Sequence, residues 1–353
     1  MGELPAPSAQ GMWYDPAKQR LAIGACIVAA FQIVAIVAAL VSSCWRVSPP
    51  AAVFAVDDEP DFECGQLGLS RPLNPDALAT IILTPKPIAK NTYNAGGMNH
   101  FKFMLHSRRI LDRVNFIVMT KHCPTAKVAH RLGLPTMHPA SGSAIGDQTY
   151  NHVMETVTRI GTGPILGFTN SDIIFLDTLP PALEAIANGI VEHGWPSVFI
   201  TGVRYNVDVP DEIMPMDRDI DDGTWRNWTA FVRANGKKFQ DITADFFFWN
   251  RDAAIDWMAL PPFLIGGTGF DNWIVAYAQA NKEIVTINLT PSVDTIHMNH
   301  GEGHVYHSHF SPASTLNLGS FDKSWDPYGE GSCDVNDLDW KVAAKTFALE
   351  PQR

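Results

Sequence analysis

The chain has 353 residues, of which 46% are hydrophobic, and it carries a formal net charge of −11. This balance argues against nucleic acid as a partner, because phosphate backbones attract clustered Lys and Arg and the sequence holds no such cluster. The chain is long enough for one large α/β domain. If an acidic domain of this kind binds a phosphorylated ligand, a divalent cation would offset the repulsion.

An uncharged apolar stretch lies near the N-terminus, at residues 21–41. At about 1.5 Å per residue, a helix of this length crosses a hydrocarbon core of roughly 30 Å. A polar segment precedes it, and basic residues on that side favour a cytosolic N-terminus. The sequence therefore predicts a cytosolic tail at 1–20, an uncleaved transmembrane signal anchor at 21–43 and a Pro- and Asp-containing stalk at 44–76.

From residue 77 the apolar residues alternate between the period of a strand and the period of a helix. Alternation at this spacing predicts βαβ units and a mostly parallel sheet with helices against it. Strands are predicted at 79–84, 114–119, 164–169 and 197–203, and helices at 100–111, 126–132, 147–160 and 179–192.

One predicted strand runs directly into Asn170-Ser171-Asp172, after which apolar residues resume. In open α/β sheets, ligands bind in the crevice outside the carboxyl ends of the strands. Asp172 is therefore a candidate residue of a metal or phosphate site. The alternative is that Asn170 and Asp172 are ordinary turn residues.

The second half of the sequence has a different character. Residues 208–224 are rich in charge and predict a long surface loop, and five histidines lie between residues 294 and 309. A polar, acidic segment follows them. Further elements are predicted as strands at 244–249 and 283–289, with a helix at 270–281 that follows a glycine run.

Two features fit a lumenal location for the domain. Asn227-Trp228-Thr229 and Asn288-Leu289-Thr290 match the acceptor pattern for N-glycosylation. Cys64, Cys123 and Cys333 lie beyond the predicted anchor, so one disulfide can form, with three possible pairings.

Besides the predicted anchor and stalk, the sequence carries in order Thr84-Pro85-Lys86-Pro87, Asn170-Ser171-Asp172, Ala244-Asp245-Phe246-Phe247, Gly269-Phe270-Asp271-Asn272-Trp273 and a late histidine. This order of features resembles the type II Golgi glycosyltransferases of the GT-A fold, in the nucleotide-diphospho-sugar transferase superfamily. The resemblance implies a GT-A-like catalytic domain at 77–310, a C-terminal extension at 311–353, and a single-pass type II protein of the Golgi or endoplasmic reticulum membrane.

The resemblance also implies a divalent metal, Mg²⁺ or Mn²⁺, which would stabilise the leaving nucleotide diphosphate as a Lewis acid. Asp172 matches the aspartate of the family's Asp-x-Asp motif that meets the metal directly, whereas Asn170 replaces the first aspartate of that motif. His297 or His300 would match the late histidine ligand. The alternative for both histidines is a solvated loop position.

Donor contacts are expected where the first strand ends, at Thr84 and Lys86, whose ammonium group can meet phosphate as a point charge. Asn170 and Asp172 complete the expected donor side. Arg204 could pair with phosphate or with an acceptor group, and an ion pair with Asp208 is the alternative.

Transfer with inversion needs a general base near the acceptor hydroxyl. Asp271 is the first candidate, with an ordinary helix N-cap as its alternative. Asp245 is the second, since a lone carboxylate ahead of an aromatic run is costly to bury without a partner. Trp249 and Trp273 could stack on sugar faces, although large aromatic residues are more often part of the core.

The sequence thus predicts a membrane-anchored glycosyltransferase that moves a sugar from a nucleotide-sugar donor to a glycan, protein or lipid acceptor with divalent-metal assistance. A metal-dependent lumenal hydrolase built on the histidine-rich segment at 294–309 stays open as an alternative. So does a catalytically inactive carbohydrate-binding protein of the same fold, which the replacement at Asn170 permits.

Overall fold

The structure, a computed structural model, describes residues 68–85, 106–108, 111–139, 149–210, 212–213, 220–299, 317 and 334–352. These residues all belong to one compact unit, Val56–Arg353. The predicted anchor at 21–43 lies outside them and stays a prediction. None of the helices formed by the described residues is long and apolar enough to cross a membrane.

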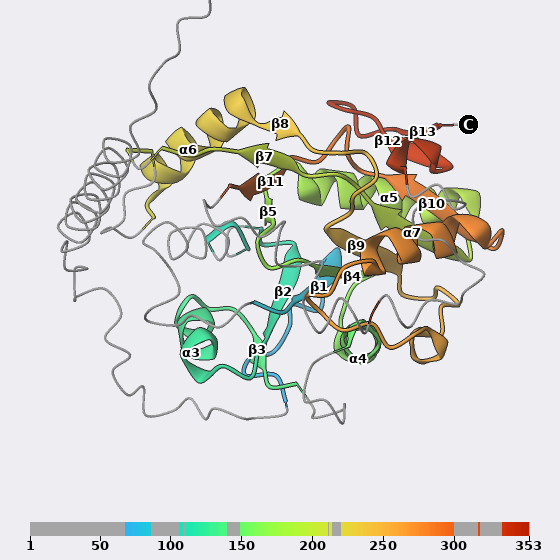
Figure 1. The fold of residues 1–353 in the computed structure, drawn as a ribbon, viewed down its shortest axis with the longest axis horizontal. Helices are drawn as coiled ribbons and strands as arrows, with labels where there is room; N and C mark the ends of the chain where they lie inside the picture. The colour runs from blue at the N-terminus through green and yellow to red at the C-terminus, as the bar shows by residue number, and fades with distance from the viewer. Residues whose placement is uncertain are drawn as a thin grey trace, which may run out of the picture. The chain divides into compact units, whose positions relative to one another are not determined.

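The main sheet, as far as the structure describes it, has nine strands in the order β13-β12-β10-β6-β9-β4-β1-β2-β3 (Figure 1). Paired strands run parallel except where β9 meets β4 and β6, and where β12 meets β13. The predicted mostly parallel α/β sheet is therefore confirmed. The strands are β1 (Ala79–Leu83), β2 (Val114–Met119), β3 (Thr136–Met137), β4 (Ile165–Thr169), β6 (Ser197–Thr201), β9 (Phe246–Asn250), β10 (Ile284–Asn288), β12 (Trp340–Val342) and β13 (Leu349–Pro351).

Both faces of this sheet are covered, because every residue of β1, β2, β4, β6 and β9 is buried and successive side chains point to opposite faces. On one face, the cross-strand partners Phe168 and Phe247 pack in a core cluster with Met154 and Ile274. On the other, Phe246 and Phe248 contact Phe175, with ring centroids 5.4 and 5.9 Å apart. The continuous apolar runs of the sequence thus become fully buried strands.

Five helices are described in full, close to the predicted positions where a prediction existed. Their ends follow local chemistry: α5, for example, has a proline in its first turn and ends at Gly194, whose φ of 63° is left-handed. The helices are α3 (Cys123–Arg131), α4 (Tyr150–Ile160), α5 (Leu179–His193), α6 (Asp222–Asn235) and α7 (Phe270–Ala280).

A second, smaller sheet was not predicted. Its strand order is β5-β11-β7-β8, and its strands are only two to four residues long, too short for a periodic pattern. The strands are β5 (Ile174–Phe175), β7 (Tyr205–Val207), β8 (Lys237–Lys238) and β11 (Thr295–Met298). This sheet connects the residues that follow Asp172 with the late segment that holds His297.

Two other expectations need correction. Part of the predicted loop at 208–224 is helical, because α6 already begins at Asp222, where Asp221 caps it by accepting a hydrogen bond from the Thr224 N–H at 2.7 Å. The acidic C-terminal segment is not only an extension: its residues form β12 and β13, which continue the main sheet next to β10.

Gly167 of β4 provides a test of how tightly this core is packed. A Cβ atom at this position would lie 2.2 Å from Cδ1 of Phe248, which is fully buried and has nowhere to move. We expect Gly167→Ala to lower the free energy of unfolding by about 1–3 kcal/mol, the usual cost of overpacking, in a urea titration. Gly68→Ala is the control, because its Cβ would meet nothing within 4 Å. Equal stability of both variants would contradict the packing.

Candidate functional site

The polar residues predicted from the sequence gather at one edge of the main sheet. The strands β1, β4, β6 and β10 run parallel to one another, so their carboxyl ends share that edge, whereas β9 runs in the opposite direction and begins there. Asn170 follows β4 and Asp245 precedes β9, and the Asn170 N–H donates to the Asp245 carbonyl at 2.8 Å. Residues far apart in the sequence therefore become neighbours.

Asp245 lies at the centre of this edge, and only 5% of it is exposed. Its Oδ1 accepts hydrogen bonds from Nη1 of Arg204 at 2.6 Å and from Nδ2 of Asn170 at 3.0 Å. Its Oδ2 is buried and accepts no hydrogen bond from any described residue. A buried carboxylate needs a cation or donors, and Asp245 has both on one oxygen only.

Arg204 is held on three sides. Its Nε donates to Oδ1 of Asn206 at 2.9 Å, and its guanidinium lies 4.4 Å from the ring centroid of Phe239. The alternative of an ion pair with Asp208 is wrong, because Arg204 pairs with Asp245 and Asp208 instead accepts from Asn299 at 3.0 Å. A phosphate contact by Arg204 stays a prediction.

The same contacts explain why an amide occupies position 170. Nδ2 of Asn170 donates to Asp245, and a carboxylate in its place would put two negative charges about 3 Å apart. The departure from the Asp-x-Asp pattern thus fits the neighbour that β9 provides. Oδ1 remains as the side-chain atom of Asn170 that a ligand could use.

Asp172 and His297 come together across the second sheet. Oδ2 of Asp172 lies 3.6 Å from Nε2 of His297, and the side chains are 32% and 13% exposed. In the sheet register His297 pairs with Asn206, the residue that binds Arg204. His297 is thereby placed next to Asp172 and beside the Arg204–Asp245 pair.

This pair of side chains fits a divalent cation. The separation of 3.6 Å is shorter than two metal–ligand bonds of about 2.1 Å, so a carboxylate oxygen and an imidazole nitrogen can reach one ion. The described residues contain no group of three or more His, Cys, Asp or Glu side chains around one point. Apart from residues outside the described ranges, water or substrate oxygens would supply further ligands. His300 and Lys86 lie outside the described residues.

The guanidinium of Arg108, which was not predicted from the sequence, supports the turn at Asp172. Arg108 is only 3% exposed, and its Nη2 donates to the Ile173 carbonyl at 3.0 Å. Burial lowers the pKa of Arg108 to about 9, and the charge of Asp172 acts in the opposite direction. Arg108 therefore fixes the turn that carries Asp172.

Asp271 is the second residue of α7, and Gly269 is the N-cap, so the alternative that Asp271 is the N-cap is wrong. Burial raises the pKa of Asp271 to about 6, and the negative charge of Asp245 adds to the effect. Hydrogen bonds from backbone N–H groups and the charge of Arg204 oppose it. Asp271 is thus a stronger base than an ordinary aspartate and still ionised at neutral pH.

Tyr150, the first residue of α4, was not predicted. Its ring stacks on Phe270 at 3.6 Å between centroids and meets Phe168 edge-on at 5.2 Å. The residue is 7% exposed, and its hydroxyl makes no hydrogen bond with the described residues. Burial raises its pKa, followed by the charges of Asp271, Asp245 and Asp172. The phenol therefore stays protonated within the field of all three carboxylates.

The remaining sequence-predicted residues have mixed outcomes. Thr84 follows β1 at the same edge and is partly exposed, which is compatible with a donor contact. Trp249 is 1% exposed and packs on Trp257, so the prediction of a sugar platform is wrong for it. Trp273 packs on Phe263 and is partly exposed, so a sugar contact stays a prediction there.

The two glycosylation sequences also differ. Asn227 is exposed on α6, where a glycan is possible. Asn288 is 3% exposed and donates Nδ2 to the Val335 carbonyl at 3.0 Å, so this fold leaves no place for a glycan on that nitrogen. Cys123 is disulfide-bonded, in agreement with the expected disulfide.

No protein-family model and no curated protein matches the sequence. Solved structures with partial similarity include S. aureus TarS 1-349 in complex with UDP-GlcNAc, at 13% identity and a TM-score of 0.38, covering 66% of this chain and 62% of that chain. A second is glucosyl-3-phosphoglycerate synthase from Mycobacterium tuberculosis in complex with Mg²⁺ and uridine-diphosphate. It has 10% sequence identity and a TM-score of 0.34, and the match covers 64% of this chain and 72% of that chain. A third is a putative nucleotide-diphospho-sugar transferase from Desulfovibrio desulfuricans G20. It has 10% sequence identity and a TM-score of 0.36, and the match covers 69% of this chain and 95% of that chain.

The match spans less than two thirds of the TarS chain. Similarity at this level of identity and overlap does not by itself assign a function to the chain.

The raised pKa of Asp271 predicts an effect on stability. Because the folded pKa of about 6 exceeds the ordinary value of 3.8, ionising Asp271 costs stability as pH rises between these values, and the full cost applies above pH 6. Asn keeps an acceptor oxygen without the charge. We therefore expect Asp271→Asn to raise the free energy of unfolding by about 1–2 kcal/mol at pH 7.5, since Asp271 retains some exposure.

Urea unfolding at pH 7.5 and near pH 3.5 measures this effect, and the gain should disappear at the lower pH. Asp222→Asn is the matched control, because Asp222 is also in the first turn of a helix but is exposed. A gain that is the same at both pH values would rule out a charge effect.

Proposed function

We propose that the chain is a glycosyltransferase that moves a sugar from a nucleotide-sugar donor to a hydroxyl group of a glycan, protein or lipid. The observation that carries the proposal is the meeting of Asp172 and His297, 3.6 Å apart, at the edge of a parallel sheet. Asp271 and the Arg204–Asp245 pair lie within electrostatic range of one another at the same edge. Ligand sites of open α/β sheets occupy this position.

The part of the proposed site that binds the sugar donor combines the Asp172–His297 pair, which would hold one metal ion, with residues that contact the nucleotide. Mg²⁺ or Mn²⁺ bound by Asp172 and His297 would offset the charge that develops on the departing diphosphate. Thr84 and Lys86 are proposed to receive the nucleotide where β1 ends. This division suits an acidic chain, whose net charge of −11 would otherwise repel a nucleotide diphosphate.

The acceptor side is assigned to Asp271. Its carboxylate takes the proton from the acceptor hydroxyl while the acceptor oxygen forms a bond to the anomeric carbon of the donor sugar. The bond between that carbon and the diphosphate oxygen breaks, and the electron pair leaves with the nucleotide diphosphate. A base with a pKa of about 6 matches this task near neutral pH, and a single displacement of this kind inverts the anomeric centre.

Asp245 and Tyr150 are assigned different parts. Oδ1 of Asp245 is shared by Arg204 and Asn170 and its Oδ2 is buried, so Asp271 is the better base and Asp245 is assigned to hold Arg204 at the site. Tyr150 keeps its proton, so its hydroxyl can donate a hydrogen bond to a bound sugar.

The proposal includes a lumenal domain on a single-pass type II anchor in the Golgi or endoplasmic reticulum. Two observations support it: the uncharged stretch within 21–43, and the disulfide at Cys123, which suits an oxidising compartment. Asn227 is the glycosylation site that this location would expose.

The proposed metal-binding pair of Asp172 and His297 is tested by Asp172→Asn, which removes the carboxylate charge and changes the side-chain volume little. We expect UDP or GDP to raise the melting temperature of the wild type only when Mn²⁺ is present, because a ligand that binds the folded state stabilises it. The variant should lose this shift and at least 100-fold of its donor turnover while its own melting temperature stays close to that of the wild type.

Asp177→Asn is the control, since Asp177 follows β5 whereas Asp172 precedes it, and Asp177 pairs with Arg233. Unchanged sugar transfer by Asp172→Asn would remove the central assignment.

Tyr150→Phe tests the proposed hydroxyl donor and keeps the stack on Phe270. Loss of one hydrogen bond to a bound substrate predicts a five- to tenfold rise in KM for the donor, about 1–1.5 kcal/mol. Tyr277→Phe is the control, because Tyr277 is a tyrosine of α7 whose ring stacks on Trp273. If both variants bind the donor like the wild type, Tyr150 is only a core residue.

A further inference from the structure

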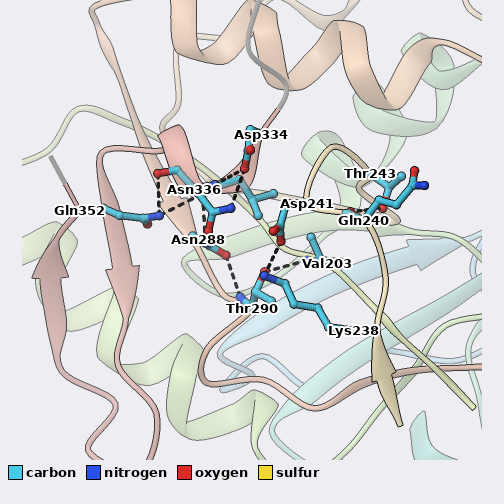
Figure 2. A network of polar contacts seen from close by, with 11 residues as sticks. Val203, Lys238, Gln240, Asp241, Thr243, Asn288, Thr290, Asp334, Asn336 and Gln352 are labelled. Atoms are coloured by element: carbon cyan, nitrogen blue, oxygen red, sulfur yellow. Dashed lines mark hydrogen bonds and ion pairs between the residues drawn. The ribbon is translucent and has the colours of Figure 1, made fainter.

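Asn288 and Thr290 of the apparent glycosylation sequence form a buried hydrogen-bonded bridge (Figure 2). Asn288 closes β10, and its Oδ1 accepts from the Thr290 N–H at 2.9 Å. Oγ1 of Thr290 then accepts from the Val203 N–H at 2.9 Å. Val203 immediately precedes Arg204, so one arm of this bridge ends at the arginine of the candidate site.

The second arm runs through Val335, a fully buried residue of the C-terminal segment. Its carbonyl accepts from Nδ2 of Asn288 at 3.0 Å and from Nε2 of Gln352 at 3.3 Å. Its N–H donates to the Asp241 carbonyl at 3.0 Å. Val335 therefore connects the end of β10 to the loop that leads into β9.

Both ends of that loop, residues 239–245, form hydrogen bonds with Arg204. The Phe239 N–H donates to the Arg204 carbonyl at 2.9 Å, and Asp245 at the other end accepts from the guanidinium at 2.6 Å. Between these points, the Ile242 carbonyl accepts from Nδ2 of Asn272 at 3.2 Å, next to the proposed base Asp271. The position of this loop therefore sets where the Asp245 carboxylate lies.

Close packing leaves little play in this region. A Cβ atom on Gly202 would lie 3.0 Å from the Thr290 nitrogen and 3.0 Å from Cζ of Phe246. Any shift of Thr290 is thus passed to the backbone beside Arg204. A buried ion pair such as Arg204–Asp245 gains from its geometry only if both partners stay in place.

We infer that Asn288 is a positioning residue for the site: it holds Arg204 through Thr290 and Asp245 through Val335, so residues 334–352 belong to the support of the active site. The inference rests on the proposed function only for the roles of Arg204 and Asp245. The clamp itself, defined as Asn288, Thr290 and Val335, follows from the contacts. Such a support can matter because a displacement of about 1 Å at a reacting centre is enough to slow catalysis 100-fold.

The alternative is that Asn288 only stabilises the fold. Asn250 offers a matched control, because it is also a buried asparagine at a strand end that bridges two segments of the main sheet. Its Oδ1 accepts from the Val198 N–H at 2.7 Å and its Nδ2 donates to the Pro196 carbonyl at 3.0 Å. It lies at the opposite end of β9 from Asp245.

The experiment compares Asn288→Ala with Asn250→Ala by hydrogen exchange and by thermal shift with UDP or GDP plus Mn²⁺. Both variants should lose similar stability. Only Asn288→Ala should speed exchange of residues 203–206 and 239–245 by about tenfold or more beyond that caused by the overall loss of stability, and weaken nucleotide binding about tenfold. Equal protection of these segments in the two variants would overturn the inference.

Thr290→Val and Thr290→Ser give a milder test if Asn288→Ala does not fold. Valine keeps the shape but removes the oxygen that accepts from Val203, so exchange of 203–206 should rise, whereas serine should restore protection. Normal protection in Thr290→Val would also overturn the inference. If the wild type binds no nucleotide, the proposed function fails, but the exchange data still decide whether the clamp exists.

Discussion

The ion pair between Arg204 and Asp245 is the contact on which the other parts of the candidate site depend. It joins the residue that follows β6 to the residue that precedes β9, and its side chains are only 19% and 7% exposed. Removing one partner of such a pair leaves a buried charge without compensation, at a cost of about 3–5 kcal/mol. Asn170, Asn206 and Phe239 all contact this pair, so much of the local sequence is explained by the need to hold it.

The direction of β9 makes this arrangement possible. A strand parallel to β4 and β6 would carry Asp245 to the far edge of the sheet, whereas the antiparallel strand begins where its neighbours end. Burial raises the pKa of Asp271, and the charge of Asp245 at the same edge adds to the effect. Arg204 offsets the negative charge of Asp245, and Arg108 interacts electrostatically with Asp172.

The sequence predicted the parts of the fold that have strong periodic patterns, such as β2, whose predicted and observed ends coincide, and α5. It also predicted Asp172 and Asp271 as candidate site residues from their positions at element ends, and their roles stay predictions. It could not reveal that Arg204 pairs with Asp245 rather than Asp208, because partners depend on strand order. The short strands that bring His297 to Asp172 have no periodic sequence pattern. Asn288 matches the N-glycosylation pattern in the sequence, but only the fold shows that it is buried.

The clamp at Val335 has a consequence for the order in which the protein assembles. During synthesis the loop that leads into β9 leaves the ribosome well before Val335 does. The Asp241 carbonyl in this loop therefore cannot accept its hydrogen bond from the Val335 N–H until that later segment has emerged. Chains grow at about 5–20 residues per second, so the wait lasts seconds. The sheet's central strands can pair during that time, but the acidic edge reaches its final geometry only after a late segment docks. The candidate site is thereby completed only when the domain is nearly finished.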